Sequence, residues 1–335
     1  MVVRAVLGAG AVAAALGAVG AGISRRQPAL AGVAAIVAFV WGVVAGLFLL
    51  RALPSLPPTT GLDRFLVILL PVALAIEAEA AANWISGFWL TAERGCVALL
   101  AVPVLLHGSV WLEGETPAVV ILAAALFLWA SWEGITGDVR ASGDRVVALM
   151  TVGALVVAGL TIAMAGWLKG GLVALPLAGA LAGALLAEWG GGPTWRRSGP
   201  GEVGGTPGLP GLTAAGLVAL FGLVVVGRCF GRLGSAAALL ILLAPLLAVL
   251  PLGIGRMLPD SAGQRLLRSA RYRILLALVP LVIVVIVAKA DFDTRLGRLV
   301  GEIPPPGPVV VAVSPSADRF KLLRTPGSAS RRVRS

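Results

Sequence analysis

The chain has 335 residues, of which 58% are hydrophobic and only 13% are charged. A soluble globular protein carries roughly 25% charged residues, so this composition leaves too little polar surface to face water on all sides. It excludes an ordinary soluble domain and predicts an integral membrane protein. The net charge of +11 does not indicate a nucleic-acid partner, because the basic residues lie in short loops between apolar runs, as the positive-inside rule expects.

The first 189 residues predict a membrane part with seven spans, since a helix needs roughly 20 apolar residues to cross a bilayer. The apolar runs are 5–23, 28–50, 65–84, 95–112, 117–133, 146–168 and 170–187. A cleaved signal peptide is the competing interpretation of the first run, although that run is longer than a typical signal core. Between the second and third runs, Pro54, Pro57 and Pro58 exclude a helix.

A Gly- and Pro-rich stretch over 190–211 predicts an irregular loop. A second membrane part follows over 212–289, with runs at 213–227, 235–253 and 274–288 that raise the expected count to about ten spans. Residues 290–335 are expected to form an extramembrane tail, with an amphipathic helix, a proline spacer and a short strand at 309–313. The prediction is an all-α, polytopic transmembrane helical bundle with a short amphipathic and extended C-terminal tail.

The loop charges also predict an orientation. Ten spans would place both termini on one side, and the positive-inside rule favours the cytoplasm for Arg25, Arg26 and the loop 256–273. The preference for arginine over lysine and the richness in Ala and Gly are associated with GC-rich bacterial genomes. The expected location is therefore a bacterial cytoplasmic (inner) membrane.

Two carboxylates in the third run are the first candidates for a buried polar site. A span that begins at Phe65 must carry Glu77 and Glu79 into the membrane zone to reach the required length. Residues two apart on a helix project about 200° from each other, so both cannot face one cavity. The chain's only histidine, His107, lies on the next span and is predicted to face one of them and titrate with it. In the competing interpretation both carboxylates lie at the interface near Trp84, where charge is tolerated.

Other polar residues at span ends are expected to anchor the bundle at the interface. Trp84, Trp89 and Arg94 would form one such belt after the third span. The glutamates that close the fifth and seventh spans, Glu133 and Glu188, are expected to be anchors beside tryptophans. The sequence contains neither HExxH nor G-x-S-x-G, and Cys96 and Cys229 lack metal-ligand spacing, so no catalytic residue, metal or cofactor is predicted.

The loop 256–273 carries a cluster of arginines beside the membrane. Such clusters attract anionic lipid head groups by about 1 kcal/mol per charge, although a topology signal alone is the competing interpretation. The arginines are Arg256, Arg265, Arg268, Arg271 and Arg273.

Three functional classes follow from this pattern. The first expectation is a non-enzymatic subunit or scaffold of a cell-envelope complex, whose partners are the lipid bilayer and either anionic lipids or other membrane subunits. The alternatives are a small-solute or proton-linked transporter using Glu77, Glu79 and His107, and a membrane-embedded enzyme acting on lipid-linked substrates. A transporter should bring polar residues from several helices together inside the bundle, whereas an enzyme should gather them at one interface.

Overall fold

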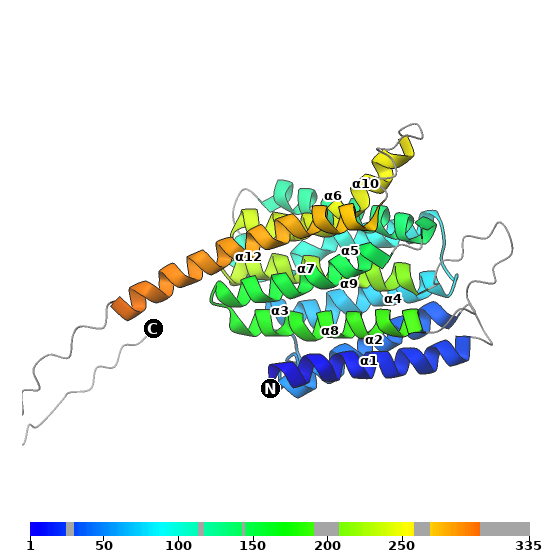
Figure 1. The fold of residues 1–335 in the computed structure, drawn as a ribbon, viewed down its shortest axis with the longest axis horizontal. Coiled ribbons are helices and arrows are strands. Elements are labelled where there is room, and N and C mark those ends of the chain that lie inside the picture. Colours follow the sequence, from blue (N-terminus) through cyan, green and yellow to red (C-terminus); the bar gives the residue numbers. More distant parts are fainter. Residues whose placement is uncertain (25–29, 113–116, 143–144, 191–207, 258–268, 302–335) are drawn as a thin grey trace, which may run out of the picture. The chain divides into compact units, whose positions relative to one another are not determined.

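A computed structural model describes residues 1–24, 30–112, 117–142, 145–190, 208–257 and 269–301. These residues fold into helices and short connections, with no strand among them (Figure 1), which confirms the all-α prediction for this part of the chain. The strand expected at 309–313, the proline spacer and most of the loop 190–211 lie outside the described residues. Met1–Thr294 form one compact unit, and the described residues of the second unit are the last turns of α12.

The helices follow one another with short connections. They are α1 (Val2–Ser24), α2 (Ala31–Leu50), α3 (Gly61–Arg64), the π-helical η2 (Phe65–Leu69), α4 (Leu70–Ala81), α5 (Phe88–Leu106), the 3-10 turn η3 (Val110–Leu112), α6 (Pro117–Ser142), α7 (Arg145–Met164), α8 (Leu168–Gly190), α9 (Leu209–Phe230), α10 (Ser235–Met257) and α12 (Ala270–Gly301). The Pro-rich segment before α3 is not helical, as expected.

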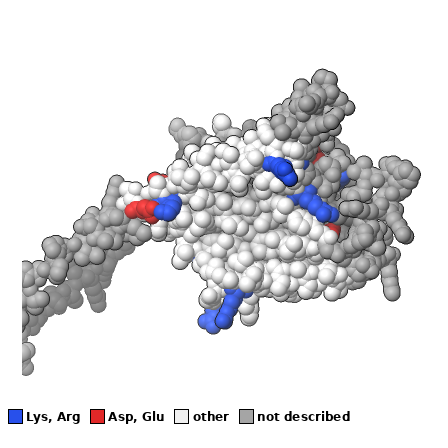
Figure 2. All heavy atoms as spheres, viewed as in Figure 1, with Lys and Arg blue, Asp and Glu red and all other residues white. Residues whose placement is uncertain are grey.

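Eight of these helices are long and apolar enough to cross a membrane, namely α1, α2, α5, α6, α7, α8, α9 and α12. Charged side chains lie toward the ends of the helices on the face shown in Figure 2 and leave its middle uncharged. Both features mark a multi-pass membrane protein. The count of about ten spans stays a prediction. Two further segments would raise the eight to ten: the unbroken helical run of α3, η2 and α4, and the shorter apolar helix α10.

Helix α9 is the core of the bundle. Nearly every residue from Leu209 to Gly227 is buried, and α9 packs against α4, α6, α7 and α8. Its 22 residues rise by about 33 Å at 1.5 Å per residue, enough to cross the apolar layer. Gly222 lets the ring of Phe65 approach the α9 backbone closely. The division into membrane parts at 190–211 stays a prediction, although α9 lies among helices that precede this loop.

Helices α1, α2 and α8 pack closely through small residues. A Cβ on Gly183 would overlap the carbonyl oxygen of Gly10, and one on Gly42 would lie 2.8 Å from the carbonyl oxygen of Ala9. The glycines spaced four apart in α2 and α8 therefore serve contacts within the bundle, because residues without a side chain let helices approach closely.

Three helices, α5, α6 and α12, have boundaries that differ from the sequence prediction. Helix α5 begins at Phe88 rather than residue 95 and ends at Leu106, because Gly87 and Gly108, with φ of +60° and +70°, bracket it. Helix α6 continues to Ser142 instead of stopping at Glu133. The expected tenth span and the surface helix after it are one continuous helix, α12. In the last two cases the helix continues through charged residues, because such side chains are tolerated near the ends of a membrane-length helix and do not break it.

Replacing Gly183 with alanine tests the α1–α8 contact. The new Cβ would overlap a backbone atom that has no rotamer to adopt, so the helices must separate. We expect a loss of about 1–3 kcal/mol, typical of overpacking, measured as thermal unfolding in detergent. Gly134→Ala is the matched control, because nothing lies within 4 Å of a Cβ there. Equal melting temperatures for the two variants would show that the contact does not constrain the bundle.

Candidate functional site

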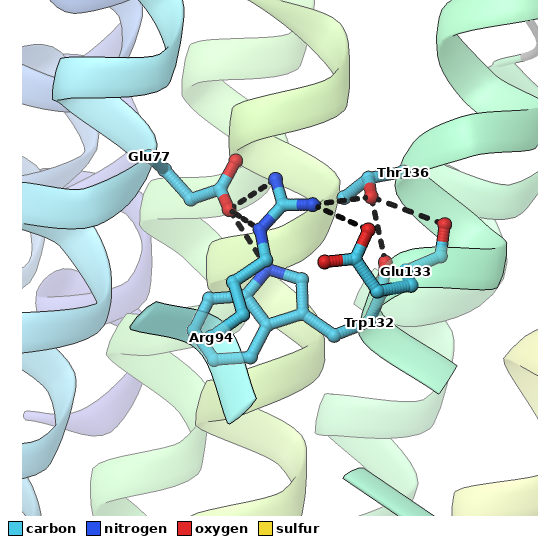
Figure 3. A network of polar contacts seen from close by, with 5 residues as sticks. All are labelled: Glu77, Arg94, Trp132, Glu133 and Thr136. Carbon is cyan, nitrogen blue, oxygen red and sulfur yellow. Dashed lines mark hydrogen bonds and ion pairs between the residues drawn. The ribbon is translucent and has the colours of Figure 1, made fainter. Parts of the chain in front are cut away.

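Three neighbouring helices bring five polar or amphipathic side chains together inside the bundle. Glu77 comes from α4, Arg94 from α5, and Trp132, Glu133 and Thr136 from α6 (Figure 3). We refer to these five residues as the charge cluster. Trp132 and Thr136 are four residues apart and therefore lie on one face of α6, which turns both toward the other two helices.

The carboxylate of Glu77 is buried and accepts bonds from two helices. Its Oε1 accepts a hydrogen bond of 2.9 Å from Nε of Arg94 and one of 2.8 Å from Nε1 of Trp132. Nη2 of Arg94 lies 2.6 Å from the same oxygen, and both charged side chains are only 2% exposed. An apolar environment makes an unpaired charge very costly, so this pair neutralises a charge that could not stay buried alone.

Arg94 also connects the pair to α6. Its Nη1 donates to Oγ1 of Thr136 at 3.0 Å and to Oε2 of Glu133 at 3.2 Å. The guanidinium carbon lies 5.7 Å from the ring centroid of Trp132, within the range of a cation–π contact. Arg94 thus bridges two carboxylates from different helices, and the planar, multidentate guanidinium suits this role better than lysine would.

Glu133 is the most accessible charge of the cluster. Its side chain is 30% exposed, and its Oε1 has no hydrogen-bond partner among the described residues. With both carboxylates ionised, the cluster carries one excess negative charge, which lies on the side chain nearest to solvent. The arrangement is a buried ion pair with a second carboxylate at its edge.

The other predicted site residues do not join the cluster. Glu79 is partly exposed, whereas Glu77 is buried, which agrees with their opposite directions on the helix. His107 is exposed and caps the C-terminal end of α5. It lies thirteen residues after Arg94, or about 20 Å along the helix, so the structure does not bring it to either carboxylate.

Arg94 is the residue that sequence reasoning misplaced. It was expected in an interfacial belt, but α5 begins before it and places its side chain inside the bundle. Glu133 was likewise expected to be an anchor at the end of a span, yet α6 continues beyond it. Gly87 was the available signal in the sequence, because glycine can adopt the positive φ found here before the helix start. A helix that begins after Gly87 includes Arg94 in its membrane-length apolar run.

The arginine cluster predicted for a loop at 256–273 is described only in part: Arg256 lies in the last turn of α10, and Arg271 and Arg273 lie in the first turn of α12. Arg271 is exposed, whereas Arg273 is 2% exposed and its Nε donates to the carbonyl oxygen of Ala248 at 2.6 Å. Arg273 therefore binds within the bundle. Arg265, Arg268 and the side chain of Arg256 lie outside the described residues, and lipid binding by this cluster stays a prediction.

The fold and the charge cluster define a multi-pass helical membrane protein with an ion pair buried between three helices. Within the described ranges, no three His, Cys, Asp or Glu side chains lie close enough together to hold a metal ion. No protein-family model matches the chain, and a search of curated proteins finds no significant match.

Replacing Arg94 with methionine would leave Glu77 buried without its cation. Removing one partner of a buried pair costs about 3–5 kcal/mol, so we expect a large fall in the melting temperature in detergent. The melting temperature of Arg94→Lys should lie between those of Arg94→Met and the native protein, since lysine keeps the charge and loses the bridging geometry.

The exposed Arg4 supplies the control for this prediction, because it lies on α1, which contributes no residue to the charge cluster. Arg4→Gln should change the free energy of unfolding by less than about 0.5 kcal/mol. A melting temperature of Arg94→Met equal to that of Arg4→Gln would mean that the ion pair contributes nothing to stability.

Proposed function

We propose that the chain is a non-enzymatic multi-pass membrane protein that serves as a subunit or scaffold of a bacterial cell-envelope complex. In this proposal the charge cluster holds α4, α5 and α6 together and performs no chemistry. The observation that carries the proposal is the mutual bonding of Glu77, Arg94 and Trp132 inside the bundle.

A catalytic acid or base must reach the proton that it transfers. Glu77 and Arg94 are each 2% exposed and are each other's partners, so neither is presented to a substrate. The pocket near His107 is lined by none of the five residues of the charge cluster. These features favour a structural role for the cluster over a catalytic one.

Large apolar side chains on the outside of the bundle supply the surface that a subunit needs. Trp41, Phe48 and Leu122 are each more than half exposed on helices long enough to span a membrane. In a bilayer such side chains contact lipid, and apolar packing also joins one membrane subunit to another.

A proton-linked transporter is the second candidate, and Glu133 is the observation that favours it. Its side chain is 30% exposed, and its buried Oε1 has no hydrogen-bond partner among the described residues, so it is the carboxylate of the cluster that is neither fully enclosed nor fully paired. Protonation of Glu133 would weaken its bond to Nη1 of Arg94 and leave Arg94 paired with Glu77 alone. Intramembrane carboxylates of this kind mark proton pathways in many transporters.

Reconstitution into liposomes with a trapped pH-sensitive dye separates the two candidates. The scaffold proposal predicts that a pH gradient decays at the same rate with the native protein, with Glu133→Gln and with no protein. A faster decay that Glu133→Gln abolishes and the control Glu79→Gln retains would favour the transporter and contradict the scaffold.

The scaffold proposal also predicts a larger assembly in native membranes. After extraction in mild detergent, the 33.9 kDa chain should migrate with a second membrane protein in fixed stoichiometry, measured by native electrophoresis and quantitative mass spectrometry. Migration of the chain alone at every detergent concentration would argue against a subunit role.

A further inference from the structure

A pocket of about 520 Å³ opens at the C-terminal end of α5, whereas the charge cluster lies near the N-terminal end of that helix. Its walls come from the start of α3, the end of α5 with η3, the α7–α8 turn and the end of α9. The volume falls within the range of about 300–1,000 Å³ that is typical of small-molecule sites. His107, which sequence reasoning placed near the carboxylates, lines this pocket instead.

Contacts between the helix ends hold the walls in place. The guanidinium of Arg64, the last residue of α3, donates to the carbonyl oxygen of His107, the residue that caps α5. Nε1 of Trp111 donates to the carbonyl oxygen of Cys229 at 3.0 Å, which joins η3 to α9. The pocket is therefore formed without a ligand, so binding requires little ordering of its walls.

The described lining is positively charged. Arg64 and Lys169 line the pocket, and none of the lining residues is acidic. The guanidinium carbon of Arg228, which does not line the pocket, lies 5.7 Å from the ring centroid of the lining residue Trp111 and adds a third positive charge nearby. The nearby Asp63 is buried, and its Oδ2 accepts hydrogen bonds from the hydroxyls of Ser55 and Thr60. The pocket thus favours an anionic group.

Aromatic side chains form the apolar part of the wall. Trp111 is 50% exposed and Phe230 is 43% exposed, and Trp167 lines the pocket beside them. Tryptophans are enriched at the depth of the lipid head groups, and these three lie where membrane-length helices end. A ligand that joins a negative charge to an apolar body matches both halves of this lining.

We propose that this pocket binds the phosphate group of an anionic membrane lipid. Arg64 and Lys169 contact the phosphate oxygens, in the charge-assisted geometry that arginine and lysine give to phosphates. Trp111 and Phe230 contact the glycerol and the first methylene groups of the acyl chains. The site is separate from the arginines that follow α10, and it does not depend on whether the protein is a scaffold.

Native mass spectrometry of the full chain, purified in mild detergent, tests the proposal. Phosphatidylglycerol, phosphatidylcholine and inorganic phosphate are added in separate arms, and the retained ligand is measured. Lys169 is the best position to change, because its side chain is exposed and it lines the pocket. Arg232→Gln is the matched control, because it removes an exposed charge just beyond α9 without touching the lining.

We expect the native protein to retain phosphatidylglycerol in preference to phosphatidylcholine. Lys169→Gln should weaken that retention about fivefold, the factor expected for one charge beside the membrane, and Lys169→Arg should restore it. Arg64→Gln should weaken it further, and the melting temperature of each variant reports whether the fold is kept.

Two results would overturn the proposal. In the first, Lys169→Gln and Arg232→Gln lower lipid retention equally, which would mean that binding follows general surface charge, or neither variant lowers it, which would mean that Lys169 does not contact the lipid. In the second, inorganic phosphate binds as tightly as phosphatidylglycerol and displaces it, so that the ligand is a soluble anion and the aromatic wall has no part in binding.

Discussion

The ion pair between Glu77 and Arg94 is the constraint on which the arrangement of α4, α5 and α6 depends. Each charge lies deep in the bundle at 2% exposure, where neither could remain ionised without the other. Because Nε1 of Trp132 bonds to the same carboxylate oxygen, the pair fixes the axial register of three helices. Sliding any one of them by a turn, about 5.4 Å, would break these bonds.

The rest of the bundle lets this register form by packing small residues closely. Helix α9 passes beside the cluster, where a Cβ on Gly211 would lie 3.7 Å from Cβ of Glu77. Small residues at such points allow helices to approach when burial in lipid supplies no hydrophobic driving force. Apolar packing against α9 and polar bonding through Arg94 therefore act on the same three helices. The packing brings the helices together without fixing their register, and the directional bonds of Arg94 fix it.

The membrane class and most helices were predictable from the sequence, because uncharged runs near 20 residues leave few alternatives. The burial of Glu77 followed from the same length requirement. The partner of Glu77 did not follow, because Arg94 stood outside the apolar run at 95–112 and only the start of α5 at Phe88 draws it inside. His107 was misplaced for a related reason: α5 ends at Leu106, just ahead of Gly108, so the histidine lies at the opposite end of the helix from Arg94. Apolar runs locate a helix well, whereas glycine with positive φ decides where its ends lie.

A double-mutant cycle of Glu77→Met and Arg94→Met tests the structural role of the ion pair. If the pair holds the helices together, each single variant leaves one buried charge without its partner. The loss in the free energy of unfolding of the double variant should then be smaller than the sum of the two single losses by about 2–3 kcal/mol. If the two losses add to within about 0.5 kcal/mol, the residues act independently, and the charge cluster does not fix the arrangement of α4, α5 and α6.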